Sequence, residues 1–139
     1  MKAEILLSAV VLAAGCSHGR AVGAASAPQP SSPDEVALAE AVKGRVAGPA
    51  QECVPESTLG STTSYGRAIV VFTSKTGDVV WVNRPVTACP EVTSERAVLD
   101  VTRQASFCRG DVVTVFDPVT RVSAGTCTLG DFTPYRRAP

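Results

Sequence analysis

Short runs of β-branched and aromatic residues follow one another from Cys53 onward, and Gly, Pro, Asp and Ser separate them. This pattern is typical of β-strands joined by turns. Two of the runs are apolar on both faces, which favours central strands buried on two sides. The predicted strands are Ala68–Thr73, Val79–Asn83, Ala97–Thr102, Val112–Phe116 and a return strand near Arg121–Thr126. The fold class expected is therefore mainly β, a small antiparallel barrel or sandwich.

Two connections between these runs have the residues of tight turns. Residues 74–78 contain Gly77 and join the first two predicted strands as a hairpin loop. Asp117-Pro118 marks a second turn. In the third predicted strand the alternation places Leu99 and Val101 on the inner face.

One short helix is expected before the β region. Ser32 is a suitable N-cap, Pro33 fits the first helical position, and Glu35 completes a capping box. Gly44 supplies a stop. The apolar face of this helix is weak and rich in alanine, so we expect it to pack on the domain as a lid.

The segment before the helix differs from the rest of the chain. Residues 16–33 are rich in small residues and proline and contain no aromatic residue. Such a segment buries too little apolar surface to fold by itself, so a flexible tether is expected. The folded domain would then span residues 34–139.

A second apolar run lies at the N-terminus. Met1-Lys2 gives a positive start, and Ile5 to Ala14 is uncharged and apolar. This run is shorter than the roughly 20 residues that a membrane-spanning helix needs, and it suits the hydrophobic region of a signal peptide. Residues 1–15 are therefore expected to be a signal peptide.

The signal peptide ends in Leu12-Ala13-Ala14-Gly15-Cys16, which resembles the lipobox of bacterial lipoproteins. Ala13 stands where a larger aliphatic residue is usual. The resemblance implies cleavage between Gly15 and Cys16, and acylation of Cys16 by diacylglycerol and an N-acyl chain such as palmitate. Several acyl chains hold a protein on a membrane far more firmly than one. With Ser17 as the second mature residue, the resemblance implies the outer membrane, with the domain facing the periplasm.

Four cysteines remain in the domain: Cys53, Cys89, Cys108 and Cys127. An even number in an exported domain of this size indicates two disulfides. A structural zinc site usually contains close Cys-x-x-Cys pairs, and none is present. Three pairings are possible. We favour Cys53–Cys127 with Cys89–Cys108, because the first would join the two ends of the β region.

Charge and residue content exclude several functions. The 13 basic and 13 acidic residues cancel, so neither a nucleic-acid partner nor an acidic cation-binding surface is indicated. The one histidine, His18, lies in the tether, which leaves the domain without a catalytic triad or a histidine-ligated metal. No cofactor is expected, and the domain is expected not to be an enzyme.

Carboxylate chemistry is the catalytic alternative that stays open. Glycoside hydrolysis needs two acids in one cleft, and it is usually accompanied by exposed aromatic platforms. Trp81 and Phe116 instead lie on strands that are expected to be buried. The candidate acids are Glu52, Glu56, Asp78, Glu91, Glu95, Asp100, Asp111, Asp117 and Asp131.

Two short motifs are interpreted as turns. Arg109-Gly110-Asp111 spells an integrin-type adhesion motif, but it follows a cysteine and precedes a strand, where Asp111 would bind local backbone. The glycine-flanked segment 125–130 lacks a phosphate-loop lysine and is expected to be a turn around a disulfide.

An ordered set of residues between Cys53 and Tyr135 resembles a group of small exported proteobacterial proteins of unknown function. The set comprises Cys53, Leu59, Val82-Asn83-Arg84-Pro85, Cys89-Pro90, Cys108, Gly110-Asp111 and the segment from Cys127 to Phe132 and Tyr135. The resemblance implies a disulfide-linked, mostly β domain in the periplasm, and it implies no reaction.

The function expected from these features is that of a lipid-anchored envelope module that binds a protein or glycan partner without catalysis. One alternative is an inhibitor of lysozyme or of a protease, with Ser61–Tyr65 and Ser74–Gly77 as exposed loops. The other alternative is a glycan hydrolase that uses two of the carboxylates.

Overall fold

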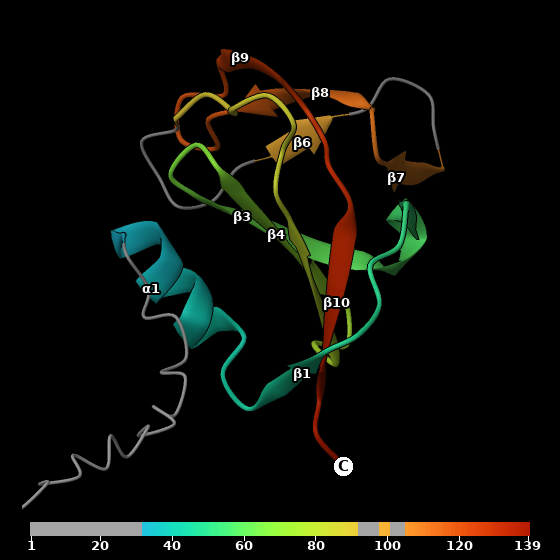
Figure 1. Ribbon diagram of the computed structural model, residues 1–139. Helices are drawn as coiled ribbons and strands as arrows, with labels where there is room; N and C mark the ends of the chain where they lie inside the picture. Colours follow the sequence, from blue (N-terminus) through green and yellow to red (C-terminus); the bar gives the residue numbers. More distant parts are fainter. Residues whose placement is uncertain (1–31, 92–97, 101–104) are drawn as a thin grey trace, which may run out of the picture.

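The computed structural model describes residues 32–91, 98–100 and 105–139 of the chain (Figure 1). Most of this part is β-structure, with one α-helix at its start and one 3-10 turn. The elements are α1 (Pro33–Ala41), β1 (Arg45–Ala47), β2 (Cys53–Pro55), η1 (Glu56–Thr58), β3 (Leu59–Tyr65), β4 (Ile69–Ser74), β5 (Val79–Asn83), β6 (Val98–Asp100), β7 (Ser106–Cys108), β8 (Val112–Phe116), β9 (Ser123–Thr128) and β10 (Phe132–Arg137).

The strands form three antiparallel sheets. The largest has five strands in the order β1-β10-β5-β4-β3, and a three-stranded sheet has the order β6-β8-β9. Strands β2 and β7 make a separate two-stranded sheet. Since β3 and β1 are the two ends of the five-stranded sheet, the sheets are open rather than closed on themselves.

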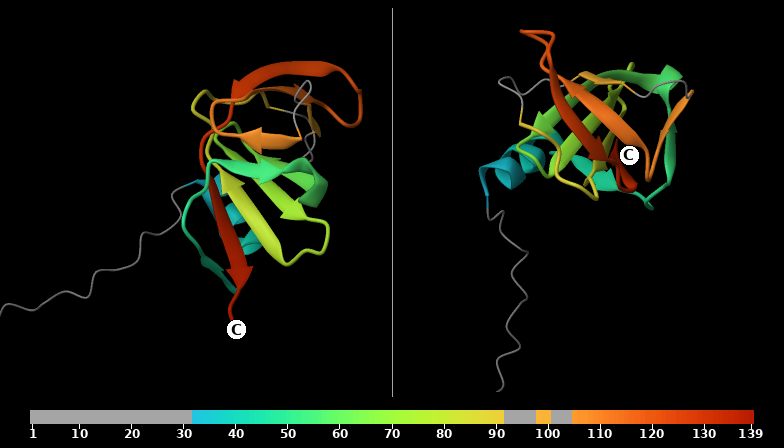
Figure 2. Two further views of the ribbon diagram at one scale, coloured as in Figure 1. Left: turned by 90° about the vertical axis from the view of Figure 1, so that its right-hand side faces the viewer. Right: turned by 90° about the horizontal axis from the view of Figure 1, so that it is seen from above.

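The main core lies between the five-stranded sheet and the two smaller sheets, which Figure 2 shows stacked over it. Phe72 and Phe132 of the large sheet are fully buried, and both lie in the same hydrophobic cluster as Val113 of β8 and Phe107 of β7. The ring of Phe72 contacts those of Phe107 and Phe132, with centroids 5.6 and 5.3 Å away. This arrangement confirms the mainly β, sandwich-like fold expected from the sequence.

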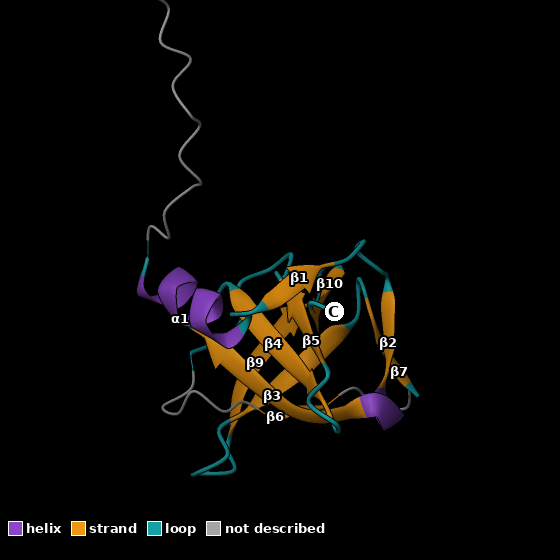
Figure 3. Ribbon diagram, turned by 90° about the horizontal axis from the view of Figure 1, so that it is seen from below, coloured by secondary structure: helices purple, strands orange, loops and turns teal. Residues whose placement is uncertain are grey.

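A second, smaller core covers the outer face of the large sheet. Leu38 of α1 packs there with Ile69 and Val71 of β4 and with Val80 and Val82 of β5. Figure 3 shows α1 lying against this sheet. Both faces of β4 and β5 are therefore covered. This confirms the prediction that these two runs are central strands buried on two sides.

The start of α1 follows the predicted cap in part. The Ser32 Oγ accepts a hydrogen bond from the Glu35 N–H at 3.2 Å, and Pro33 occupies the first turn. The capping box would return the Glu35 carboxylate to the backbone of Ser32. Instead the carboxylate accepts two hydrogen bonds, of 2.7 and 3.1 Å, from the Arg84 guanidinium after β5. The ion pair thus joins the helix to the sheet.

Two disulfides are present, but with a pairing other than the one we favoured. Cys53 is bonded to Cys108 and Cys89 to Cys127, so the predicted Cys53–Cys127 and Cys89–Cys108 bonds are wrong. The reason is the β2–β7 sheet, in which Cys53 and Cys108 are direct cross-strand partners. Strand β2 is only 3 residues long and gives no alternating pattern. Cys89–Cys127, with both cysteines buried, ties the segment after β5 to β9.

Four of the five predicted strands match β4, β5, β8 and β9 within two residues at each end, and β6 lies within the fifth. Five further strands were not predicted: β1, β2, β3, β7 and β10. The side chains of Leu99 and Val101 lie outside the description. Cys16 and His18 also lie outside the description, as do the segment expected to be a signal peptide and nearly all of the segment expected to be a tether. In the part of the chain that is described, the one α-helix is too short to cross a membrane.

Candidate functional site

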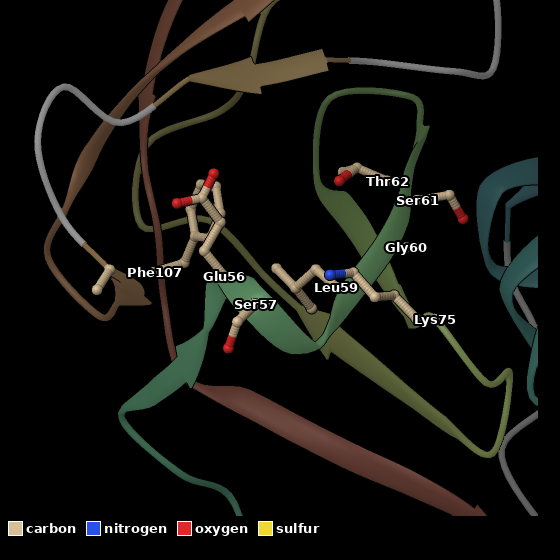
Figure 4. A pocket seen from close by; sticks show the side chains of 9 residues that line it. Glu56, Ser57, Leu59, Gly60, Ser61, Thr62, Lys75 and Phe107 are labelled. Carbon is tan, nitrogen blue, oxygen red and sulfur yellow. The ribbon is translucent and has the colours of Figure 1, made fainter.

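A groove opens at the edge of the sandwich, between β3 of the large sheet and the β2–β7 sheet. Its volume is about 540 Å³, within the range of natural ligand sites. The lining residues come from η1, the first half of β3, the β4–β5 turn and β7. They are Glu56, Ser57, Leu59, Gly60, Ser61, Thr62, Lys75, Ala105 and Phe107 (Figure 4).

A β-bulge brings the β4–β5 turn to the groove. The pairing of β3 with β4 shifts between Leu59 and Ser61, which leaves Gly60 as the extra residue. A Cβ on Gly60 would lie 3.0 Å from the Lys75 Cα, which is tighter than most such contacts, so glycine eases the close approach of the two backbones. The Lys75 N–H then donates to the Thr58 carbonyl at 3.0 Å. The bulge therefore fixes Lys75 at the rim of the groove.

The opposite rim is held by backbone hydrogen bonds of η1. The Glu56 N–H donates to the Ala105 carbonyl at 2.9 Å, which fastens the start of η1 to the segment before β7. The Thr58 hydroxyl donates to the Pro55 carbonyl at 2.7 Å and closes the turn. Glu56 is thus presented from a backbone that is fixed at both ends.

The groove combines an apolar base with a polar rim. Phe107 is 5 % exposed and forms part of the base with the half-buried Leu59. Glu56 and Lys75 are both exposed and lie on either side of Leu59 in Figure 4. The hydroxyls of Ser57, Ser61 and Thr62 lie among them. A ligand would therefore meet both charges, several hydroxyls and one apolar strip.

Strand β3 is an edge strand without a charged residue or a proline. It is the end strand of the five-stranded sheet, and in the described part of the chain no strand pairs with its other side. Its 7 residues, Leu-Gly-Ser-Thr-Thr-Ser-Tyr, include no charge and no proline. Proteins usually protect such edges with charged residues or proline, since the unpaired backbone groups accept a further strand. β3 has neither residue type, and its bulge at Gly60 lies near its start, so among the described residues the edge from Ser61 onward can accept a further strand.

The structure brings together the two segments that were expected to be exposed loops of an inhibitor. Ser61–Tyr65 is not a loop but the greater part of β3, which corrects that expectation. Ser61 and Thr62 from this segment and Lys75 from Ser74–Gly77 nevertheless line the same groove. No pattern in the sequence indicated a role for Phe107, because β7 is only 3 residues long.

The candidate carboxylates are mostly apart from one another. Glu56 is the one carboxylate among the described residues that line the groove. Glu52, Asp78, Glu91 and Asp131 are exposed, whereas Asp111 and Asp117 accept hydrogen bonds within turns. The side chains of Glu95 and Asp100 lie outside the description. Among the residues that the structure describes, the groove thus has one acid, whereas a glycoside hydrolase requires two.

The first of the two short motifs is a turn, as expected, whereas the second is mostly strand. The Asp111 carboxylate accepts a hydrogen bond from the Cys108 N–H at 2.7 Å, and Gly110 has a φ of 88°. Arg109 pairs with Asp131 at 3.4 Å. The expected turn at segment 125–130 is wrong: its residues 125–128, with the buried Cys127, lie in β9 and pair with β8, and only residues 129–130 lie in the connection to β10.

The two aromatic residues that were expected to be buried differ in how far they are exposed to solvent. Trp81 is buried, at 7 % exposure, in the main core. Phe116 is half-buried, because it points to the outer face of β8, so the expectation of burial was wrong for this residue.

Metal-binding groups were also sought among the described residues. No three of their His, Cys, Asp and Glu side chains gather into a cluster that could hold an ion. The four domain cysteines are bonded in pairs.

Comparison with known proteins adds no relative to this picture. No protein-family model, no curated protein and no solved structure matches the chain.

Proposed function

We propose that this protein is a lipid-anchored module of the bacterial cell envelope that binds an extended segment of a partner protein without catalysis. The proposed anchor is the acylated Cys16, and the proposed location is the outer membrane, facing the periplasm. The observation that carries the binding function is the uncharged edge of β3 beside a groove with an apolar base. An extended segment can add to such an edge as a further strand.

The residues of the groove suit this mode of binding. In strand addition, main-chain hydrogen bonds supply affinity, and pockets for alternate side chains supply specificity. Leu59 and Phe107 would receive an apolar side chain of the added strand. Glu56 and Lys75 would select a segment that carries charges of both signs at the matching positions.

The same features give less support to the alternatives. A glycan could use the hydroxyls of the groove, but aromatic side chains on which sugars stack are not exposed in it, since Phe107 is buried. A hydrolase would need a second carboxylate beside Glu56. The inhibitor alternative is compatible with strand addition, because a protease binds its substrates as extended segments.

The binding proposal is tested in cells with the full-length chain. A photo-reactive residue in place of Ser57 should cross-link to a protein, and the adduct should map to an extended segment of it. Ser61→Lys adds a protective charge to the edge and should reduce this adduct strongly. Thr126→Lys changes an exposed residue of β9, the edge strand of the other sheet, and should leave the adduct unchanged.

Other outcomes would contradict the proposal. An adduct to peptidoglycan would favour the glycan alternative, and turnover of a cell-wall substrate by the purified chain would favour the hydrolase. Equal adduct yields from both lysine variants would show that the β3 edge is not the binding element.

The proposed anchor has its own test. Metabolic labelling with an alkyne analogue of palmitate should mark the wild-type chain. Cys16→Ser should abolish the label and release the protein from the membrane fraction. A label that persists in Cys16→Ser would contradict acylation at this residue.

A further inference from the structure

The connection between β8 and β9, residues 117–122, projects from the sandwich, and we call it the hairpin tip. Figure 2 shows it in orange on the side of the domain away from the start of α1. Val119 and Val122 are 75 % and 62 % exposed. Two large apolar side chains are thus exposed on a projecting turn.

The backbone of the hairpin tip is held by its own hydrogen bonds. The Asp117 carboxylate accepts from the N–H groups of Val119 and Thr120, at 2.8 and 3.1 Å. The Arg121 N–H donates to the Asp117 carbonyl at 2.7 Å, and the Asp117 N–H donates to the Val122 carbonyl at 3.1 Å. A turn fixed in this way loses little conformational entropy when it binds a partner.

Arg121 occupies a position that suits other residue types better. Its φ is 56°, in the left-handed region that Gly, Asn and Asp adopt more readily. Its side chain is exposed, and none of the hydrogen bonds and ion pairs found among the described residues involves it. The charge at this position is therefore directed to the solvent, on the most prominent part of the domain.

A recess lies at the base of the hairpin tip. Its volume is about 370 Å³, and it is lined by Phe116, Asp117, Pro118 and Arg121. The half-buried Phe116 gives it an apolar wall. Residues 116–122 thus provide two exposed valines, one cation and an apolar recess.

We propose that the hairpin tip inserts into a recess of a partner protein, where Arg121 pairs with a carboxylate and the two valines pack on apolar walls. A stable flat interface needs about 800 Å² from each partner, more than a six-residue turn provides, so the partner must surround it. Arginine forms strong two-point hydrogen bonds with carboxylates in sites closed to water. The proposal does not depend on the groove beside β3.

A lipid surface fits the hairpin tip less well. Binding to anionic membranes requires clusters of basic residues, and the hairpin tip has one. In the left view of Figure 2 it also lies on the side of the domain away from the start of α1. One kind of recess with the required chemistry is the cleft of a glycan hydrolase such as lysozyme, because it holds two carboxylates.

Photo-cross-linking of the full-length chain in its own envelope tests the proposal. A photo-reactive residue in place of Val119 should cross-link to a protein, at a site where Asp or Glu lies in a recess. The same residue in place of Val86, which is 72 % exposed on another surface, is the control and should not give this adduct.

The role of the charge is tested with a matched pair of variants. Arg121→Asn removes the charge but keeps a residue that adopts the left-handed conformation, and it should lower the adduct yield at least about tenfold. Arg137→Asn removes an exposed arginine from β10 and should leave the yield unchanged. Lysozyme activity in the presence of the purified chain adds a direct assay of one recess of this class.

Several results would overturn the proposal. These are the absence of an adduct at Val119, an adduct to lipid or to a second copy of this chain, and a yield that Arg121→Asn does not change. Ser61→Lys in the groove should not affect the Val119 adduct, so failure of the groove proposal and failure of this one are distinguishable.

Discussion

Asn83 at the end of β5 makes the most sharply testable polar contact of the core. It is fully buried, and its side-chain amide forms a ring of two hydrogen bonds with the backbone of Gly130. The Nδ2 group donates to the Gly130 carbonyl at 2.7 Å, and Oδ1 accepts from the Gly130 N–H at 2.9 Å. Gly130 packs so closely on the Arg84 carbonyl that a Cβ would collide with it. The ring therefore holds the β9–β10 connection against the large sheet.

We predict that Asn83→Leu destabilises the domain by about 2 to 6 kcal/mol. Leucine has a similar volume, so little packing is lost. The Gly130 N–H and carbonyl remain buried and lose their partners, and each such group costs about 1 to 3 kcal/mol. A domain of this size has a free energy of unfolding of about 5 to 15 kcal/mol, so the change is a large part of the total.

Urea unfolding measures this effect. Trp81 is the single tryptophan and is buried, so its fluorescence reports the transition. Cys16→Ser in all samples removes the proposed acylation thiol, and the disulfides stay oxidised. Gln51→Leu is the control: its amide donates to the Cys53 carbonyl at an exposed site, and we expect a change within about 0.5 kcal/mol. Equal effects of the two substitutions would refute the reasoning.

Three further predictions concern other contacts. Gly66→Ala should destabilise the domain more than Gly77→Ala. Both residues have a positive φ, but only at Gly66 would the added Cβ collide with another residue, Asp34. Urea unfolding of the two variants compares their free energies of unfolding. The Arg84 guanidinium lowers the pKa of Glu35, mainly by hydrogen bonding, so wild type should exceed Glu35→Gln in stability by up to about 1 kcal/mol at pH 7. That advantage should disappear as the pH falls through the lowered pKa, and unfolding curves from pH 7 to pH 3 would show a constant difference if the ion pair were irrelevant. Dithiothreitol should reduce the disulfide of the β2–β7 sheet before the buried one, as mass spectrometry after alkylation can show, because Cys53 is exposed whereas Cys89 and Cys127 are 1 % and 2 % exposed.

The elements that could be predicted are those whose own residues indicate whether they are buried or exposed. Strands β4 and β5 carry apolar residues on both faces, so their burial could be predicted from composition alone. The Ser32 cap depends on residues within one turn of the helix. The even number of cysteines indicated two disulfides, but their pairing depends on which strands are neighbours, and β2 and β7 are too short to give a pattern.

The missed strands have a common physical cause. β3 consists mainly of Ser and Thr, and its side chains are largely exposed or half-buried, so no apolar period marks it. β10 contains Pro134, which usually argues against an interior strand, yet it lies between β1 and β5. Both strands are defined by the partners that the fold gives them, and this information is not in the local sequence.

The same cause explains why the candidate binding surfaces could not be located beforehand. The groove depends on a bulge at Gly60, which places Lys75 next to β3, and on a disulfide-linked pair of strands that supplies Phe107. Each residue by itself resembles an ordinary surface or core position. A stable sandwich needs neither an unprotected edge at β3 nor an arginine at a positive φ, and both features run against the rules that stabilise such folds. Features of this kind persist in proteins mainly where a partner uses them, and for that reason the β3 edge and Arg121 are the positions at which substitution should affect binding more than folding.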